Sequence, residues 1–192
     1  MVKKPSRSVQ TTGGIAIAAR SAHMEFLNAI QDTALASWVR ESTSLFAYTG
    51  MLFIHAVGLA VCAGMSAAVG LRILGVGSSI PLAPLERLFP VIWTGVWLNV
   101  LSGVPLVMSN AAKDLINPTF YAKMLFILFA VIYVRRVRHQ VFLGAPGGTV
   151  IEASAAGRGL TKMMLAMWAG AIMAGRLCEY PQLLGLDYVM GH

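Results

Sequence analysis

One ionisable side chain, His55, lies near the middle of the longest uncharged stretch of this sequence. The stretch runs from Ser42 to Leu71 and is bounded by Glu41 and Arg72. A neutral imidazole can ligate iron or another transition metal, and it can also accept or donate a proton. Polar groups at membrane depth are costly, and for that reason they indicate a function. His55 is therefore the first candidate site residue and the candidate metal ligand.

Further polar side chains are expected near the depth of His55. That residue lies about ten positions, or about 15 Å of helix, into the first predicted span. The second span runs in the opposite direction and returns Asn99 to about the same depth, while Lys123 opens the third span on the same side. The candidate cofactor-binding residues in this half of the membrane are Tyr48, His55, Gly58, Asn99, Lys123 and Arg176. Ser102 belongs to the same polar cluster.

Three functions compete for this cluster. His55 could be an axial ligand of haem b, with Gly58 leaving room for the porphyrin and Lys123 or Arg176 meeting a propionate. It could instead serve a quinone or proton site, with Asn99 and Lys123 as hydrogen-bond partners. A buried polar network that only specifies helix packing is an equally open alternative, because no second histidine lies at matched depth.

Copper handling is a lesser alternative. Met163, Met164, Met167 and Met173 lie close together in the fourth predicted span, and thioether sulfur binds copper(I). Methionine is more often an adaptable filler of helix interfaces. The sequence contains no paired carboxylates, catalytic triad, HExxH or phosphate-loop motif, so it indicates no enzyme class.

The composition predicts an all-α membrane protein. Of the 192 residues, 57% are hydrophobic and 12% are charged, against about 25% charged in a soluble domain. A span needs about 20 apolar residues, and four segments reach that length. We expect a four-transmembrane-helix bundle over residues 42–192, with spans at about 44–72, 88–110, 117–135 and 160–179.

The segments before the bundle differ from it in character. Residues 1–23 form a basic tail, and residues 24–41 show helical spacing of apolar side chains that predicts an amphipathic helix at the membrane interface. Within the first span, small residues recur every four positions and predict close approach of another helix or a flat ligand. These residues are Gly58, Cys62, Ser66 and Gly70. Arg176 and Glu179 are three apart and so are able to pair on one helix face.

The basic residues indicate an orientation. The cluster Arg135–Arg138, joined by Arg158 and Lys162, places the third connection in the cytoplasm under the positive-inside rule. With four spans, both termini then face the periplasm of a bacterial inner membrane. The basic residues lie at the ends of the apolar runs, which fits contact with anionic lipid and not nucleic-acid binding.

The sequence resembles an uncharacterised family of small bacterial inner-membrane proteins, a domain of unknown function. The resemblance covers Phe26 to Arg138, and Leu71 stands where that family often has an acidic residue before the arginine. The motifs that carry it are His55 with Gly58, the run RILG from Arg72, Pro90, Gly95, Gly103, and NPTFYAKMLFIL with Asn117, Phe120 and Lys123. A first-span histidine with a later lysine is also similar to two other groups. These are the membrane-type protoporphyrinogen oxidases, which implies haem b at His55, and the copper-resistance membrane protein D family.

Together these observations predict a haem b-binding membrane subunit that relays electrons between a partner and the quinone pool. The alternative is a non-enzymatic structural or assembly subunit of a larger membrane complex. Both alternatives imply the lipid bilayer and a protein partner, or a second copy of the chain, as the partners.

Overall fold

The computed structural model describes residues 18, 21–42, 44, 47–143 and 153–180. These residues form helices and no strand, which confirms the all-α prediction. Most of the predicted basic tail (1–17 and 19–20) lies outside the described residues, as do residues 144–152 and 181–192. Residues 21–23, which the sequence placed in the tail, already belong to a helix.

Four long helices occupy the four predicted spans. They are α3 (Tyr48–Ile73), α4 (Leu88–Ser109), α6 (Pro118–Val137) and α7 (Ala155–Glu179). The segments Tyr48–Ile73 and Ala83–Ser109 are long and apolar enough to cross a membrane, by length and composition. Among the described helices, α6 and α7 do not reach that standard, so two of the four predicted spans meet it. Both helices carry charges away from their ends, namely Lys123 in α6 and Lys162 in α7, whereas the charges of the first two segments lie at their ends.

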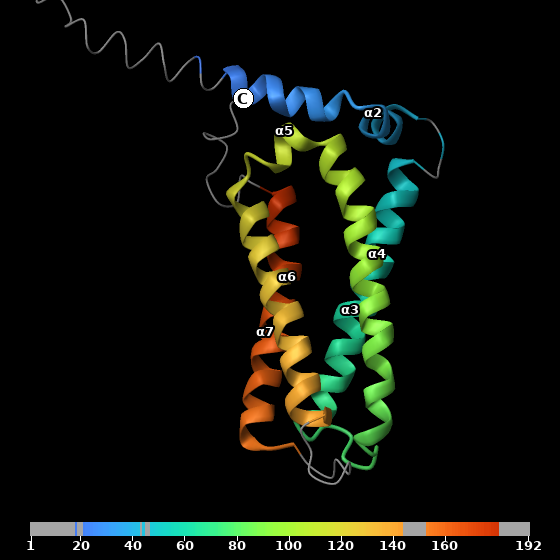
Figure 1. The fold of residues 1–192 in the computed structure, drawn as a ribbon, viewed down its shortest axis with the longest axis vertical. Helices are drawn as coiled ribbons and strands as arrows, with labels where there is room; N and C mark the ends of the chain where they lie inside the picture. The colour runs from blue at the N-terminus through green and yellow to red at the C-terminus, as the bar shows by residue number, and fades with distance from the viewer. Residues whose placement is uncertain (1–17, 19–20, 43, 45–46, 144–152, 181–192) are drawn as a thin grey trace, which may run out of the picture.

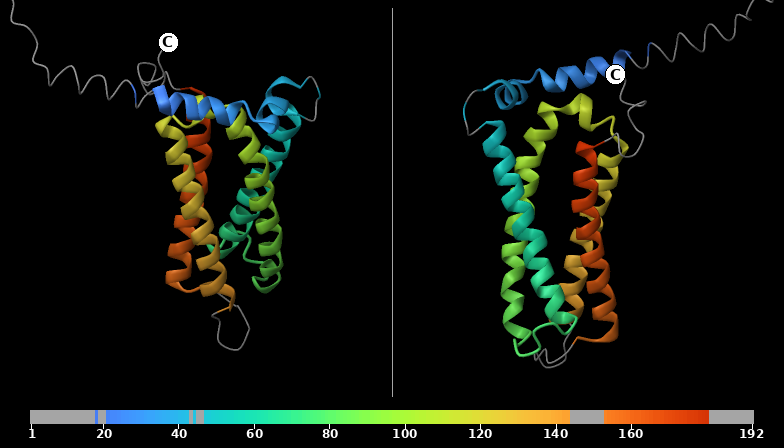
Figure 2. Two further views of the ribbon diagram at one scale, coloured as in Figure 1. Left: turned by 45° about the horizontal axis from the view of Figure 1, so that its top comes forward. Right: turned by 180° about the vertical axis from the view of Figure 1, so that it is seen from behind.

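The long helices are arranged as two antiparallel pairs, α3 with α4 and α6 with α7 (Figure 1). Contact between the pairs runs mainly through α3 and α7. The short helix α5 (Ala111–Asp114) links the pairs at one end (Figures 1 and 2). Each pair is a packed unit, and α3 and α7 both take part in contacts within a pair and between the pairs.

The amphipathic segment before the bundle lies across one end of it (Figure 2). The sequence predicted one helix over residues 24–41, but the structure has a helix over 21–31 and then α2 (Ala34–Glu41), so the prediction of a continuous helix is wrong. The break falls at Asp32 and Thr33, where the Thr33 backbone is extended. Ala36 and Val39 are fully buried, and α2 packs on α4.

The other end of the bundle is closed by a turn and by an ion pair. Gly75 and Gly77 adopt φ values of 104° and 66°, which favour glycine, and α3 ends just before them. Arg72 donates hydrogen bonds to the turn carbonyls of Ile80 and, at 3.1 Å, Ser78. Glu86, in the 3-10 helix η1 (Ala83–Arg87), pairs with Arg138 at 3.3 Å and so ties the two helix pairs together.

The hydrophobic core sits toward this closed end. Its largest members include Ile73 of α3, Phe89 of α4, Val137 of α6 and Trp168 of α7. From there the helix pairs diverge toward the end covered by residues 21–41 (Figures 1 and 2). The predicted site residues lie in the diverging half.

Candidate functional site

His55 lies in the interface between α3 and α4. Its ring packs over Gly103, where an added Cβ would meet the ring Cε1 at 3.0 Å. Its Nδ1 lies 3.2 Å from the hydroxyl oxygen of Ser102, which is itself buried. Glycine at position 103 therefore makes the space that the imidazole occupies, and Ser102 fixes the ring by one nitrogen.

The hydrogen bonds of Ser102 decide which nitrogen of His55 carries the proton. The Ser102 hydroxyl donates to the carbonyl of Leu98 at 2.6 Å, with the Asn99 carbonyl at 3.3 Å. A hydroxyl has one proton, so Ser102 can only accept from His55. His55 is then the Nδ1–H tautomer, and Nε2 keeps its lone pair. No described residue forms a hydrogen bond with Nε2.

Asn99 and Gly58 hold the two helices together beside His55. The Asn99 side-chain amide donates to the His55 carbonyl at 3.0 Å. An added Cβ at Gly58 would lie 2.8 Å from the Asn99 backbone nitrogen and 3.1 Å from the Gly95 carbonyl oxygen. The space beside Gly58 is thus filled by α4, which corrects the expectation that Gly58 leaves room for a porphyrin. Gly58 is a helix-packing residue in this structure.

Lys123 reaches the site from the other helix pair. Its aliphatic chain lies against Gly175 of α7, with Cδ and Cε both 3.8 Å from the position of an added Cβ. Lys123 is also the charged group that acts electrostatically on His55. The structure therefore brings His55, Asn99 and Ser102 into direct contact, with Lys123 as the nearby cation across the bundle.

Further charged groups lie near Lys123, at the end of the bundle that residues 21–41 cover. Burial raises the pKa of the Asp114 carboxyl, and Glu179 raises it further, while Lys113 and Lys123 lower it. Lys113 forms an exposed ion pair with Glu179 at 3.4 Å. Two acidic and two basic groups thus gather at the α5 end of α6 and α7.

Tyr48 and Arg176 are not brought to His55. Both side chains are exposed, and the described part of the chain contains no hydrogen bond or ion pair for either. Arg176 does not pair with Glu179, which pairs instead with Lys113. Counting residues along a span locates depth, but it does not determine which way a side chain near the helix end turns.

No group of three or more His, Cys, Asp or Glu side chains that could hold a metal ion exists among the described residues. The four methionines of α7 differ in exposure: Met164 is 1% exposed, whereas Met163 and Met173 are 44% and 61% exposed. Methionines that face both the core and the surface do not form one line of thioethers for copper.

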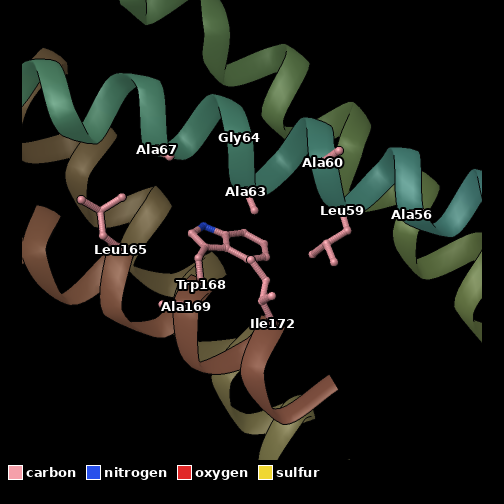
Figure 3. A pocket seen from close by; sticks show the side chains of 10 residues that line it. All are labelled: Ala56, Leu59, Ala60, Ala63, Gly64, Ala67, Leu165, Trp168, Ala169 and Ile172. Atoms are coloured by element: carbon pink, nitrogen blue, oxygen red, sulfur yellow. The ribbon is translucent and has the colours of Figure 1, made fainter. Parts of the chain in front are cut away.

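A groove that the sequence analysis missed lies between α3 and α7 (Figure 3). It encloses about 500 Å³ and is lined almost entirely by apolar atoms. Its lining residues are Ala56, Leu59, Ala60, Ala63, Gly64 and Ala67 of α3, and Leu165, Trp168, Ala169 and Ile172 of α7. The signal in the sequence was a second row of small residues, Ala56, Ala60 and Gly64, at four-residue spacing.

Comparison of the chain with protein-family models, with curated proteins and with solved structures gave no significant match. The resemblance noted from short motifs therefore supplies no family assignment. The function must be argued from the site alone.

Proposed function

We propose that the chain is an integral membrane subunit that binds haem b through Nε2 of His55 and relays electrons between a partner and the quinone pool. The observation that carries this proposal is the tautomer: Nδ1–H is held by Ser102, which leaves the Nε2 lone pair without a partner among the described residues. Histidine ligands of metals are commonly oriented in this way, through a hydrogen bond from the other ring nitrogen.

The residues around His55 suit haem b in their chemistry. A single neutral imidazole is a sufficient proximal ligand for haem iron. Lys123, which lies close enough to act electrostatically on His55, offers a cation for a propionate. When bound, haem supplies one-electron redox chemistry. The chain's own residues supply the ligand, its orientation through Ser102, and the charge.

In this proposal α6 and α7 cross the membrane beside α3 and α4. They contain 20 and 25 residues, so they extend about 30 Å or more at 1.5 Å per residue. Arg135 and Arg136 in the last turn of α6 would lie at the cytoplasmic surface of a bacterial inner membrane, with both termini on the periplasmic side. The helix of residues 21–31 and α2 would then rest on the periplasmic surface.

A structural or assembly subunit is the second candidate, and one observation favours it. Asn99 and Ser102 make most of their hydrogen bonds to helix backbone, as expected for polar residues that fix the α3–α4 interface. In that case His55 is one more packing residue, and the exposed faces of the helix of residues 21–31 and of α2 would contact the partner.

An absorption spectrum of the protein purified in detergent separates the two candidates. Haem binding predicts a Soret band with α and β bands on reduction, lost in His55→Ala. His139→Ala is the matched control, because His139 is exposed in the segment η2 (Arg138–Leu143), which follows α6 at the opposite end of the bundle. A folded, colourless wild type, even when haem is supplied, would overturn the haem proposal and leave the structural role.

A further inference from the structure

The groove between α3 and α7 contains a polar group without a partner. Trp168 is 4% exposed, and its indole nitrogen is buried with no hydrogen-bond partner among the described residues. A buried indole N–H usually finds an acceptor, because leaving it unpaired is costly. Figure 3 shows the nitrogen on the edge of the ring that faces α3.

The shape of the groove favours a flat ligand. Apart from Leu59, its α3 side is made of alanine and glycine, and an added Cβ at Gly64 would meet nothing within 4 Å. Leu59 and Ile172 provide apolar walls. A volume of about 500 Å³ falls within the usual range of small-molecule sites. Such a groove accepts an aromatic or quinonoid ring face-on against α3.

The position of Trp168 along α7 limits which molecules could bring a hydrogen-bond acceptor to its indole N–H. Trp168 is near the middle of α7 (Ala155–Glu179), whereas membrane tryptophans are concentrated at the two interfaces. Phospholipid ester carbonyls lie at the interface, about 15 Å from the midplane. An acceptor for this N–H must therefore be carried into the hydrocarbon by an apolar molecule. A ring carbonyl meets that requirement and an acyl chain does not.

We propose that the α3–α7 groove binds the ring of a lipid-soluble quinone, with the Trp168 indole N–H donating to a ring carbonyl. The inference deepens the proposed function, on which it rests for the assignment of α7 to the membrane. It places the quinone against α3 and α7, whereas the His55 ring packs against Gly103 of α4. The groove does not contain His55, so quinone binding there does not require haem.

The test measures binding of a ubiquinone with a decyl tail to the full chain in phosphatidylcholine nanodiscs, with empty nanodiscs as the blank. Gly64→Leu places a large side chain in the groove, and its Cβ would meet nothing within 4 Å. Gly159→Leu is the matched control, because an added Cβ there also meets nothing within 4 Å and Gly159 lies outside the groove. We expect saturable binding by the wild type and by Gly159→Leu, and a loss of at least tenfold in Gly64→Leu.

Trp168→Phe tests the hydrogen bond, since it keeps an aromatic ring and removes only the N–H donor. We expect about fivefold to tenfold weaker binding, the usual net value of one hydrogen bond. Ala60→Leu is a second groove-filling variant, should Gly64→Leu be unstable. Circular dichroism establishes that each variant is folded.

Several results would overturn the inference. No saturable binding above empty nanodiscs would do so, as would equal affinity in Gly64→Leu and Gly159→Leu. If Gly64→Leu instead converts a dimer to a monomer while the wild type binds no quinone, the groove is a contact with a second copy. A colourless wild type that still binds quinone in the groove contradicts only the haem proposal.

Discussion

Helix α3 presents two rows of small residues, and the structure uses them in different ways. Gly58 and Cys62 face α4, where the backbones of the two helices touch. Ala56, Ala60 and Gly64 face α7 and remain exposed along a groove. Both rows have the four-residue spacing that favours close helix packing. Spacing on one helix therefore does not decide whether its neighbour approaches.

The residue that faces each row on the neighbouring helix decides how closely the two helices approach. Opposite Gly58, α4 presents Gly95, so neither helix has a side chain in the way. Opposite Ala60 and Gly64, α7 presents Trp168, whose ring stands between the helices (Figure 3). A glycine pair gives a rigid contact between backbones, whereas a small residue facing a tryptophan leaves space beside the ring.

Gly95→Ala should break the tight contact and have the largest effect on stability. The added Cβ would lie 2.7 Å from the backbone nitrogen of Cys62 and 3.0 Å from the Gly58 carbonyl oxygen. Because helix backbone cannot move aside locally, we expect a loss of about 2–3 kcal/mol in the free energy of unfolding. Denaturant titration in detergent, followed by circular dichroism, measures it. A change near zero would mean that α4 is further from α3.

Gly170→Ala is the informative comparison with Gly95→Ala. Its added Cβ would make an equally short contact, but with a side chain and not with helix backbone. The added Cβ would lie 2.7 Å from Cδ1 and Cε1 of Phe126. A phenylalanine ring can shift where a backbone cannot, so we expect a smaller loss of about 1 kcal/mol. The same titration measures it. A loss equal to that of Gly95→Ala would show that Phe126 is fixed in place.

Gly64→Ala should have the smallest effect, and of the opposite sign. Nothing lies within 4 Å of the added Cβ, and alanine is the better helix former. We expect a gain of about 0.5 kcal/mol in the free energy of unfolding. Destabilisation in this variant would mean that another helix or subunit covers the groove in the membrane.

The positions of α3 and α4 could be predicted from the sequence because each contains an apolar run long enough to span a membrane. Helices α6 and α7 also lie where spans were expected, although charges interrupt their apolar runs. Helix α3 ends just before Gly75 and Gly77, which both adopt positive φ. The break in the amphipathic segment at Thr33 was missed, since no glycine or proline marks it. Apolar periodicity continues through residues 34–41 and conceals it.

Within the site, counting residues along the spans predicted that His55 and Asn99 share a depth, and they are in direct contact. The roles assigned to these residues stay predictions. Two features were beyond reach: that α4 fills the space at Gly58, and that α7 leaves the Ala56–Gly64 row open. Each depends on a residue of another helix, Gly95 or Trp168, and spacing within one helix carries no information about it.

The most direct test of the haem proposal is chemical rescue of His55→Ala. Removing the imidazole from α3 opens a space beside Gly103 that free imidazole can enter. If Nε2 of His55 ligates iron, the variant loses the Soret band, and millimolar imidazole restores it in the presence of haem. A packing role for His55 predicts no such band in the wild type and no response to imidazole in the variant. Either of those results would contradict the account.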